Sequence, residues 1–198
     1  MKNAQQLKGL IDQVFELAHL EGGQVSLNLE AFNLAELLYD VVAKFSLQTV
    51  AKQIDVTMIP ECSYAQVDSD IGKLERVLSN LLENAIRHTP VLGEITLVIT
   101  DINQHQCQLT ITDTGIKEEE LLYIFNTRYR ASNAVQDKEK HTGLGLAITK
   151  KLLELLKSDI KVTSILGKGS SFSFNLRKVM CRFYFNGRNF LLISLEYL

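Results

Sequence analysis

The stretch LERVLSNLLENAIRHTP, residues 74–90, constrains the fold of this chain more than any other segment. It reads as one amphipathic helix, and Asn80 and Asn84 lie on the same face because they are four residues apart. Two amides are costly to bury without partners, and a divalent metal carrying phosphates would supply those partners. Arg87 and His88 follow within one turn. The segment therefore predicts either one wall of a nucleoside triphosphate pocket or a helix whose asparagines merely face water.

Composition and charge exclude several classes of protein. Of the 198 residues, 46% are hydrophobic and 22% are charged, which is typical of a globular domain. The net charge of -2 predicts no surface for nucleic acid or anionic lipid. The three cysteines, Cys62, Cys107 and Cys181, form no C-x-x-C pair, so neither a zinc site nor a disulfide framework is expected.

The same features predict where the chain acts. No window reaches the length of a membrane span, and the first residues lack the apolar core of a signal peptide. Together with the cysteine pattern, this favours a reducing cytoplasm. Contact with a membrane is expected only through regions absent from this sequence.

Helix and strand patterns interleave along the chain, which predicts an α+β protein. Residues 2–20 carry an apolar stripe that one helix cannot bury alone, so we expect a partner helix from another segment or another chain. Asn33 and Glu36 form a capping-box pattern at the start of a helix over 34–51. Asp70 is the expected cap of the asparagine-bearing helix.

The remaining elements complete a two-layer α/β sandwich. We expect a mixed sheet of about five strands, covered on one face by three helices and preceded by one long amphipathic helix. Further helices are predicted at 117–125 and 144–157, and strands at 25–30, 55–59, 64–67, 95–100, 106–112, 160–165 and 170–176. Residues 126–142 read as a loop. The apolar tail, 179–198, contains the hairpin signal Asn186-Gly187 and has no predicted role.

A second candidate site element is Asp113-Thr114-Gly115, directly after an apolar strand pattern. A carboxylate at a strand end, followed by glycine, can reach into a pocket while the backbone turns sharply. It accepts hydrogen bonds, so an exocyclic amine such as that of adenine is a natural partner. A plain turn is the alternative.

A third element is the run HTGLGL, residues 141–146, at the start of the 144–157 helix. Its two glycines expose backbone N–H groups where a helix N-terminus offers positive potential, an arrangement that holds phosphate. No G-K-[ST] follows, so the run is not a P-loop. The polar loop before it carries Lys138 and Lys140 and could close over phosphates as a lid.

A fourth element is Ile124-Phe125 followed by Tyr129-Arg130. Phe125 is expected to anchor the base of the lid in the core. Arg130 could reach a γ-phosphate or lie on the surface in water, and its position alone does not decide between the two.

In order and spacing, these elements resemble the catalytic ATP-binding domain of two-component sensor histidine kinases, within the wider gyrase/Hsp90/MutL-like ATPase fold. NLLENAIRHTP resembles the N box, DTG at 113–115 the start of the G1 box, IFNTRYR at 124–130 the F box, and HTGLGLAITKKLLELL the G2 box. LGKGSSFSFNL resembles the closing strands. Residues 2–24 resemble the second helix of a dimerisation and histidine-phosphotransfer hairpin and its exit.

The resemblance implies a Bergerat-like fold and a role for each matching residue. Asn84 would coordinate Mg²⁺ bridging the ATP phosphates, with Asn80 nearby. Arg87 and His88 would contact phosphate or ribose. Asp113 would accept a hydrogen bond from the adenine amine.

The glycine-rich segments would complete the nucleotide site. Gly115 would let the base approach, and Gly143 and Gly145 would cradle phosphates through their N–H groups. Arg130 would help orient the γ-phosphate, so Asn84 and Arg130 are the expected catalytic residues. Catalysis would depend on positioning and charge neutralisation rather than on a protein nucleophile. The expected nucleotide-binding set also includes Lys140, Thr142 and Leu144.

One position separates members of this superfamily. Hydrolytic members and the related anti-sigma serine kinases carry Glu four residues before the metal-binding asparagine, where this chain has Asn80. Glu83 points about 100° away around the helix from Asn84, so it is a poor substitute. The resemblance therefore favours a histidine kinase over an ATPase.

The chain departs from the family pattern in two places. The G1 box usually reads D-x-G-x-G-I, whereas this chain reads DTGIKEEE, as though two residues were absent. This change is expected to reshape the purine side of the pocket and to weaken or abolish ATP binding. None of the histidines, His19, His88, His105 and His141, has the H-E-[LF]-R-T-P-like context of the acceptor.

We therefore expect three parts: an incomplete hairpin at 1–24, a kinase domain at 25–178 and an atypical tail at 179–198. The leading interpretation is the ATP- and Mg²⁺-dependent catalytic core of a sensor histidine kinase, which phosphorylates a histidine outside this chain. Expected partners are an acceptor hairpin, a response regulator receiver domain and a second copy bound through helix 2–20. The alternatives are an impaired nucleotide- or partner-binding module with a shortened G1 loop and a dimerising remnant.

Overall fold

The structure is a computed structural model that describes residues 2–23, 25–61, 66–113, 143–165, 169–179, 181–186 and 189–195. Its helices are α1 (Lys2–Glu21), α2 (Leu34–Lys44), α3 (Ser46–Lys52), α4 (Ile71–His88) and α5 (Gly145–Leu155). Its strands are β1 (Glu30–Asn33), β2 (Asp55–Pro60), β3 (Gln66–Ser69), β4 (Glu94–Asp101), β5 (Gln106–Asp113), β6 (Lys161–Ile165), β7 (Gly169–Arg177), β8 (Cys181–Asn186) and β9 (Asn189–Leu195). None of the helices in these ranges is long and apolar enough to cross a membrane.

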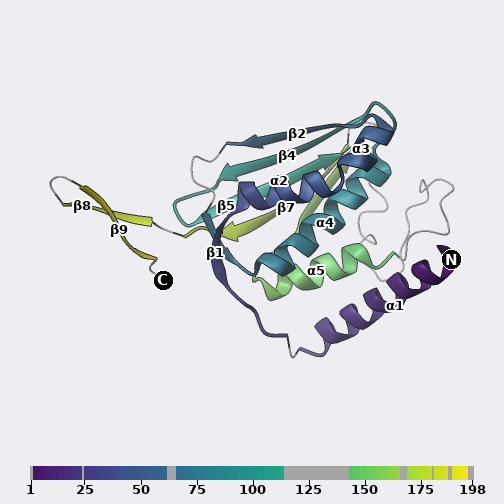
Figure 1. Cartoon of the computed structure of the whole chain (residues 1–198), viewed down its shortest axis with the longest axis horizontal. Coiled ribbons are helices and arrows are strands. Elements are labelled where there is room, and N and C mark those ends of the chain that lie inside the picture. Colours follow the sequence, from purple (N-terminus) through teal and green to yellow (C-terminus); the bar gives the residue numbers. More distant parts are fainter. Residues whose placement is uncertain are drawn as a thin grey trace.

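A five-stranded mixed sheet, in the order β2-β4-β5-β7-β6, forms one layer of the molecule. The strands β2 and β4 pair in parallel, and the other neighbours pair antiparallel. Figure 1 shows α2, α4 and α5 side by side over one face of this sheet, with α1 beyond α5. This arrangement confirms the predicted two-layer sandwich with its helices on one face.

Alternation along the strands explains which face the helices cover. On β5, Cys107, Leu109 and Ile111 are buried, whereas the residues between them are half-buried. Phe172 and Phe174 continue the buried face on β7. The helix α4 packs against β5 and contributes the buried apolar side chains Leu74, Val77, Leu78, Leu81, Leu82, Ala85 and Ile86. The apolar stripe of α4 therefore forms the centre of the core.

Local signals fix both ends of α4. The Oδ1 atom of Asp70 accepts a hydrogen bond from the backbone N–H of Lys73 at 3.0 Å, which confirms the predicted cap. The helix ends at His88, and Thr89 is extended because the residue before a proline, here Pro90, is disfavoured in the helical region.

The C-terminal half of α1 packs against the rest of the chain. Leu17 and Leu20 are buried, and α1 contacts α5. On the same helix, Leu7 and Phe15 are 57% and 71% exposed. The apolar stripe predicted at 2–20 is therefore only partly covered.

A second, two-stranded sheet pairs β1 with β3. Val67 of β3 forms a bridge with Lys178, and the Val179 N–H donates to the Gln66 carbonyl at 3.0 Å, so the chain after β7 binds β3. The antiparallel hairpin of β8 and β9 follows, as the sequence predicted.

The prediction of a strand at 25–30 is wrong except at Glu30, where β1 begins. The carbonyl oxygen of Ser26 accepts a hydrogen bond from Lys73 Nζ at 3.1 Å, and the N–H of Asn28 donates to Asp70 Oδ2 at 3.0 Å. These backbone groups bind side chains at the start of α4 instead of pairing with a strand.

The helix predicted over 34–51 is broken at Phe45 into α2 and α3. Phe45 leaves the helical region with φ −100° and ψ 2°, and its side chain packs against the hydrophobic core. Periodicity alone does not reveal this tertiary contact. The helix predicted at 117–125 and the loop predicted at 126–142 lie outside the described residues.

The predicted capping box is confirmed in part. Asn33 caps α2 by accepting a hydrogen bond from the Ala35 N–H at 3.0 Å. Glu36 accepts from the side-chain amide of Asn33 at 3.3 Å instead of from its backbone. The acidic side chain therefore orients the capping amide.

Candidate functional site

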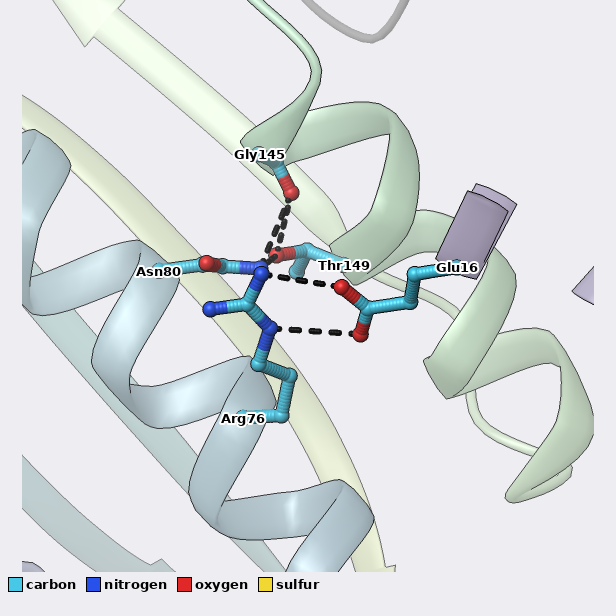
Figure 2. Close-up of polar contacts among 5 residues, drawn as sticks. All are labelled: Glu16, Arg76, Asn80, Gly145 and Thr149. Atoms are coloured by element: carbon cyan, nitrogen blue, oxygen red, sulfur yellow. Dashed lines mark hydrogen bonds and ion pairs between the residues drawn. The ribbon is translucent and has the colours of Figure 1, made fainter. Parts of the chain in front are cut away.

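Asn80 joins the C-terminal half of α4 to α5. It is 6% exposed, and its Nδ2 donates to the carbonyl oxygen of Gly145 at 3.2 Å and to Oγ1 of Thr149 at 3.3 Å, as Figure 2 shows. Oγ1 of Thr149 in turn donates to the Gly145 carbonyl at 2.9 Å. These bonds connect α4 to the first turn of α5.

Asn84 lies one turn further along α4, on the same face, and is 7% exposed. Its Nδ2 atom is buried and makes no hydrogen bond to any part of the chain that the structure describes. Leaving such a donor unbonded costs about 1–3 kcal/mol. The fold alone does not account for this amide, whereas a polar ligand would.

The last turn of α4 carries the predicted basic groups. Arg87 is exposed, and its Nη2 lies 3.8 Å from Glu83 Oε1. His88 is half-buried beside it. Both residues therefore lie one turn beyond Asn84, at the edge of the helix layer.

A lysine that no motif singled out binds the C-terminal carbonyl groups of α4. Lys52 Nζ donates to the carbonyl oxygens of Ile86, Arg87 and Thr89 at 2.8, 3.1 and 3.2 Å. Burial, and then the charge of Arg87, lower the pKa of Lys52. A cation here also complements the helix dipole. Lys52 therefore fixes the turn that carries Arg87 and His88.

Asp113 ends β5 on the face that the helices cover. It is 3% exposed and follows Ile111 in the strand alternation. Gly169, with φ +134°, lies against its backbone, and a Cβ added at this glycine would strike the Asp113 carbonyl oxygen. Only glycine fits this close approach, so Gly169 helps to place the carboxylate. The sequence included this glycine only in the run that resembles the closing strands.

The start of α5 carries two of the predicted glycines, Gly143 and Gly145. Gly143 has φ +71°, a left-handed conformation that favours glycine. Leu144, the N-cap residue, is buried, and its side chain makes no capping hydrogen bond. The first intrahelical bond runs from Ile148 N–H to the Leu144 carbonyl at 2.9 Å. The N–H groups of Gly145, Leu146 and Ala147 therefore have no acceptor within the helix, at an end that attracts anions.

The C-terminus of α4, the end of β5 and the start of α5 lie toward the same end of the sheet (Figure 1). Thr112 of β5 pairs with Thr96 near the start of β4, and β4 follows the C-terminus of α4. Asp113 therefore lies at that end of α4. The bond between Asn80 and Gly145 brings the start of α5 to the same half of the helix.

Four predicted site residues, Gly115, Arg130, Lys140 and Thr142, lie outside the described residues, and their roles stay predictions. Within the described ranges, no group of three or more His, Cys, Asp or Glu side chains could hold a metal ion. Asn84 therefore remains the candidate metal-binding residue among those described. A single amide oxygen suits Mg²⁺ that is bound mainly through substrate phosphates and water.

Comparison with known proteins now places the chain in a family. Residues 69–180 match the family model described as histidine kinase-, DNA gyrase B-, and HSP90-like ATPase. The chain therefore belongs to this family, and the predicted resemblance is confirmed.

The similar proteins are sensor histidine kinases. The sensor histidine kinase GacS of Pseudomonas protegens is 31% identical over 185 residues, which cover 89% of this chain and 20% of GacS. The adaptive-response sensory kinase SasA of Synechococcus sp. is 32% identical over 172 residues, which cover 86% of this chain and 45% of SasA. The chain therefore spans less than half the length of either relative.

Solved structures agree with this assignment. Full-length ShkA in complex with AMPPNP superimposes with a TM-score of 0.76 at 25% identity, covering 87% of this chain and 36% of ShkA. The catalytic domain of the histidine kinase ThkA gives a TM-score of 0.65 at 25% identity, covering 76% of this chain and 96% of that domain. The family and these neighbours identify an ATP-binding domain of the histidine kinase type.

Proposed function

We propose that this chain binds ATP with Mg²⁺ between α4, the end of β5 and the start of α5, and transfers the γ-phosphoryl group to a histidine on a helical hairpin. The observation that carries the proposal is the buried amide of Asn84, whose Nδ2 has no partner in the described ranges. The buried carboxylate of Asp113 at the same end of the sheet supports it. Full-length ShkA is described in complex with AMPPNP, which supports ATP as the ligand.

In this proposal the described residues bind and orient the nucleotide. The amide oxygen of Asn84 holds Mg²⁺, and its Nδ2 donates to a phosphate oxygen. Asp113 accepts a hydrogen bond from the adenine amine. Arg87 and His88 contact phosphate or ribose. Mg²⁺, when bound, neutralises negative charge on the phosphate oxygens.

The glycine-rich segment at the start of α5 receives phosphate. Gly143, Leu144 and Gly145 place backbone N–H groups at the positive end of the helix. Gly115, Lys140 and Thr142 complete the proposed nucleotide contacts, and Arg130 orients the γ-phosphate. The acceptor imidazole supplies the nucleophile, so the chain contributes positioning and charge.

The proposed partners follow from the exposed face of α1. Its apolar stripe exposes between 40% and 71% of five side chains, namely Leu7, Leu10, Ile11, Val14 and Phe15. We assign this stripe to a second copy of the chain and to the hairpin that carries the acceptor histidine. In this proposal, residues 1–24 form the dimerisation part, residues 25–178 form the catalytic domain and residues 179–198 form the tail. A response regulator would receive the phosphoryl group in the cytoplasm. Sedimentation analysis that finds only monomers would contradict the dimer.

Titration with AMPPNP, with and without Mg²⁺, tests nucleotide binding. We expect Mg²⁺-dependent binding that Asp113→Asn weakens about tenfold, since the amide mispairs with the adenine amine. The matched control is Asp101→Asn. Asp101 ends β4 at the opposite end of the sheet, where it pairs with Lys178. Equal affinities in all three proteins would argue against the assigned adenine site.

Phosphotransfer is tested with an acceptor hairpin supplied in trans and radiolabelled ATP. Acid-labile, base-stable label on the hairpin is the expected result, because phosphohistidine has this stability. Binding of AMPPNP without transfer would favour the second interpretation, a nucleotide-binding module whose shortened G1 box no longer supports catalysis.

A further inference from the structure

The first turn of α5 is held by two side chains that no sequence motif assigns to this task. The carbonyl oxygen of Gly145 accepts hydrogen bonds from Asn80 Nδ2 and Thr149 Oγ1, at 3.2 and 2.9 Å. The two side chains also bind each other at 3.3 Å, which closes a triangle of hydrogen bonds (Figure 2). One corner lies on α4 and two lie on α5.

This triangle determines the direction of a backbone N–H group. Gly145 and Leu146 share a planar trans peptide group, so the Gly145 carbonyl and the Leu146 N–H point in opposite directions. A carbonyl held from two sides therefore fixes the N–H as well. The N–H groups of this turn have no intrahelical acceptor, and the Leu144 side chain does not cap them.

We propose that Asn80 and Thr149 are positioning residues that hold these N–H groups toward a bound phosphate. The inference rests on the proposed function, which assigns phosphate to this turn. Asn80 Nδ2 donates to two acceptors of α5, the Gly145 carbonyl and Thr149 Oγ1, so this nitrogen is bound within the protein. The two asparagines of α4 then have different tasks, because Asn80 orients the binding turn and Asn84 binds the nucleotide.

Burial supports this division. Thr149 is fully buried, and its apolar neighbours on α5, Ile148 and Leu152, are buried as well. A valine would occupy the same place with no hydroxyl group to satisfy. The hydroxyl of Thr149 is explained by the carbonyl that it binds, together with the amide of Asn80.

The test is the Thr149→Val variant in the full chain, titrated with ATP·Mg²⁺ and separately with adenosine. We expect a loss of affinity for ATP of about tenfold, because the turn no longer holds its N–H groups in place. Affinity for adenosine, which has no phosphate, should stay within about twofold. Thr149→Ser keeps the hydroxyl and should restore ATP affinity.

The chain offers a matched control in Thr49. This threonine is also buried, and its Oγ1 donates to a carbonyl of its own helix, that of Ser46, at 3.0 Å. Thr49→Val therefore removes a similar bond without touching α5. It should leave both affinities unchanged, which separates positioning of phosphate from general loss of stability.

A double-mutant cycle examines the pair. Thr149→Val should cost less ATP affinity in an Asn80→Ala background, because the triangle is already open. The inference is overturned if Thr149→Val binds ATP like the unaltered chain, or if ATP and adenosine weaken equally. Failure of the unaltered chain to bind ATP would overturn the proposed function, and this inference with it, which is a distinguishable result.

Discussion

The two ends of α4 are held in different ways. At the N-terminal end, the Asp70 carboxylate accepts hydrogen bonds from the Lys73 backbone, the Lys73 ammonium and the Asn28 backbone. At the C-terminal end, Lys52 binds three backbone carbonyls, and Asn84 nearby keeps a buried amide nitrogen without a partner in the described chain. The first end anchors the preceding segment, whereas the second leaves a buried donor that the proposed nucleotide would bind.

The largest expected effect comes from Asn84→Leu, which makes the ligand end apolar. ATP affinity should fall roughly a hundredfold, because the amide contacts to phosphate and metal are lost. The free energy of unfolding without nucleotide should stay the same or rise by about 1 kcal/mol, because an unbonded buried donor disappears. Calorimetric titration and urea unfolding measure the two effects.

Asn175→Leu is the control for this variant. Asn175 is half-buried on β7 and accepts a hydrogen bond from Gln108 Nε2 at 3.1 Å. Its loss should reduce stability and leave ATP affinity unchanged, the reverse of the pattern at Asn84. The same pattern at both positions would break the comparison between the two ends of α4.

Lys52→Met should have the next largest effect. It leaves three carbonyl groups without their cation, which should lower the free energy of unfolding by about 2 kcal/mol. Urea unfolding measures this loss. Lys44→Met is the matched control, since Lys44 ends α2 and forms an exposed ion pair with the side chain of Glu75. An equal loss for both variants would show that the carbonyl contacts of Lys52 contribute nothing particular.

Asp70→Asn tests the anchoring end and should cost about 1 kcal/mol at neutral pH. Burial raises the pKa of Asp70, but hydrogen bonds from Lys73 and Asn28 and the Lys73 charge outweigh burial, so the pKa lies below its ordinary value of 3.8. The carboxylate is therefore favoured in the folded state. Its stabilisation is fully present above pH 3.8 and is lost as the pH falls through the lowered pKa.

Urea unfolding measured at several pH values checks the contribution of Asp70. The curve of stability against pH should be shallower for Asp70→Asn than for the unaltered chain in the acid range. Parallel curves would mean that other carboxylates account for acid sensitivity.

Glu16→Gln should have the smallest effect, about 0.5 kcal/mol. Glu16 of α1 forms two hydrogen bonds with Arg76 of α4, at 2.9 and 3.2 Å, and both side chains are partly exposed (Figure 2). We expect faster hydrogen exchange in α1, because this ion pair helps to hold α1 on the domain. Glu75→Gln, which breaks the pair with Lys44, is the control and should leave exchange in α1 unchanged.

Local patterns predicted the parts of this molecule that depend on neighbours in the sequence. The cap at Asp70, the end of α4 before Pro90 and the alternating strands follow from residues a few positions apart. The break at Phe45 could not be predicted in this way, because it depends on packing against the core. The sequence also did not predict the backbone bonds of Ser26 and Asn28 to the start of α4.

In the candidate site too, the sequence predicted some residues and did not reveal others. The motifs pointed to Asn84 and Asp113, and the structure buries both at one end of the sheet. The partners that orient them come from distant positions: Thr149 is 69 residues from Asn80, and Gly169 reaches Asp113 through strand pairing. Spacing within a motif carries no information about such contacts.

The buried thiol of Cys107 is a built-in probe of transient opening of the fold. The residue is fully shielded by the strands and helices around it. A thiol-specific dye can react there only during moments when the layers separate. In a chain whose other two cysteines are replaced, the rate of labelling would report how often the sheet and the helices separate. A nucleotide that binds both layers would lower this rate.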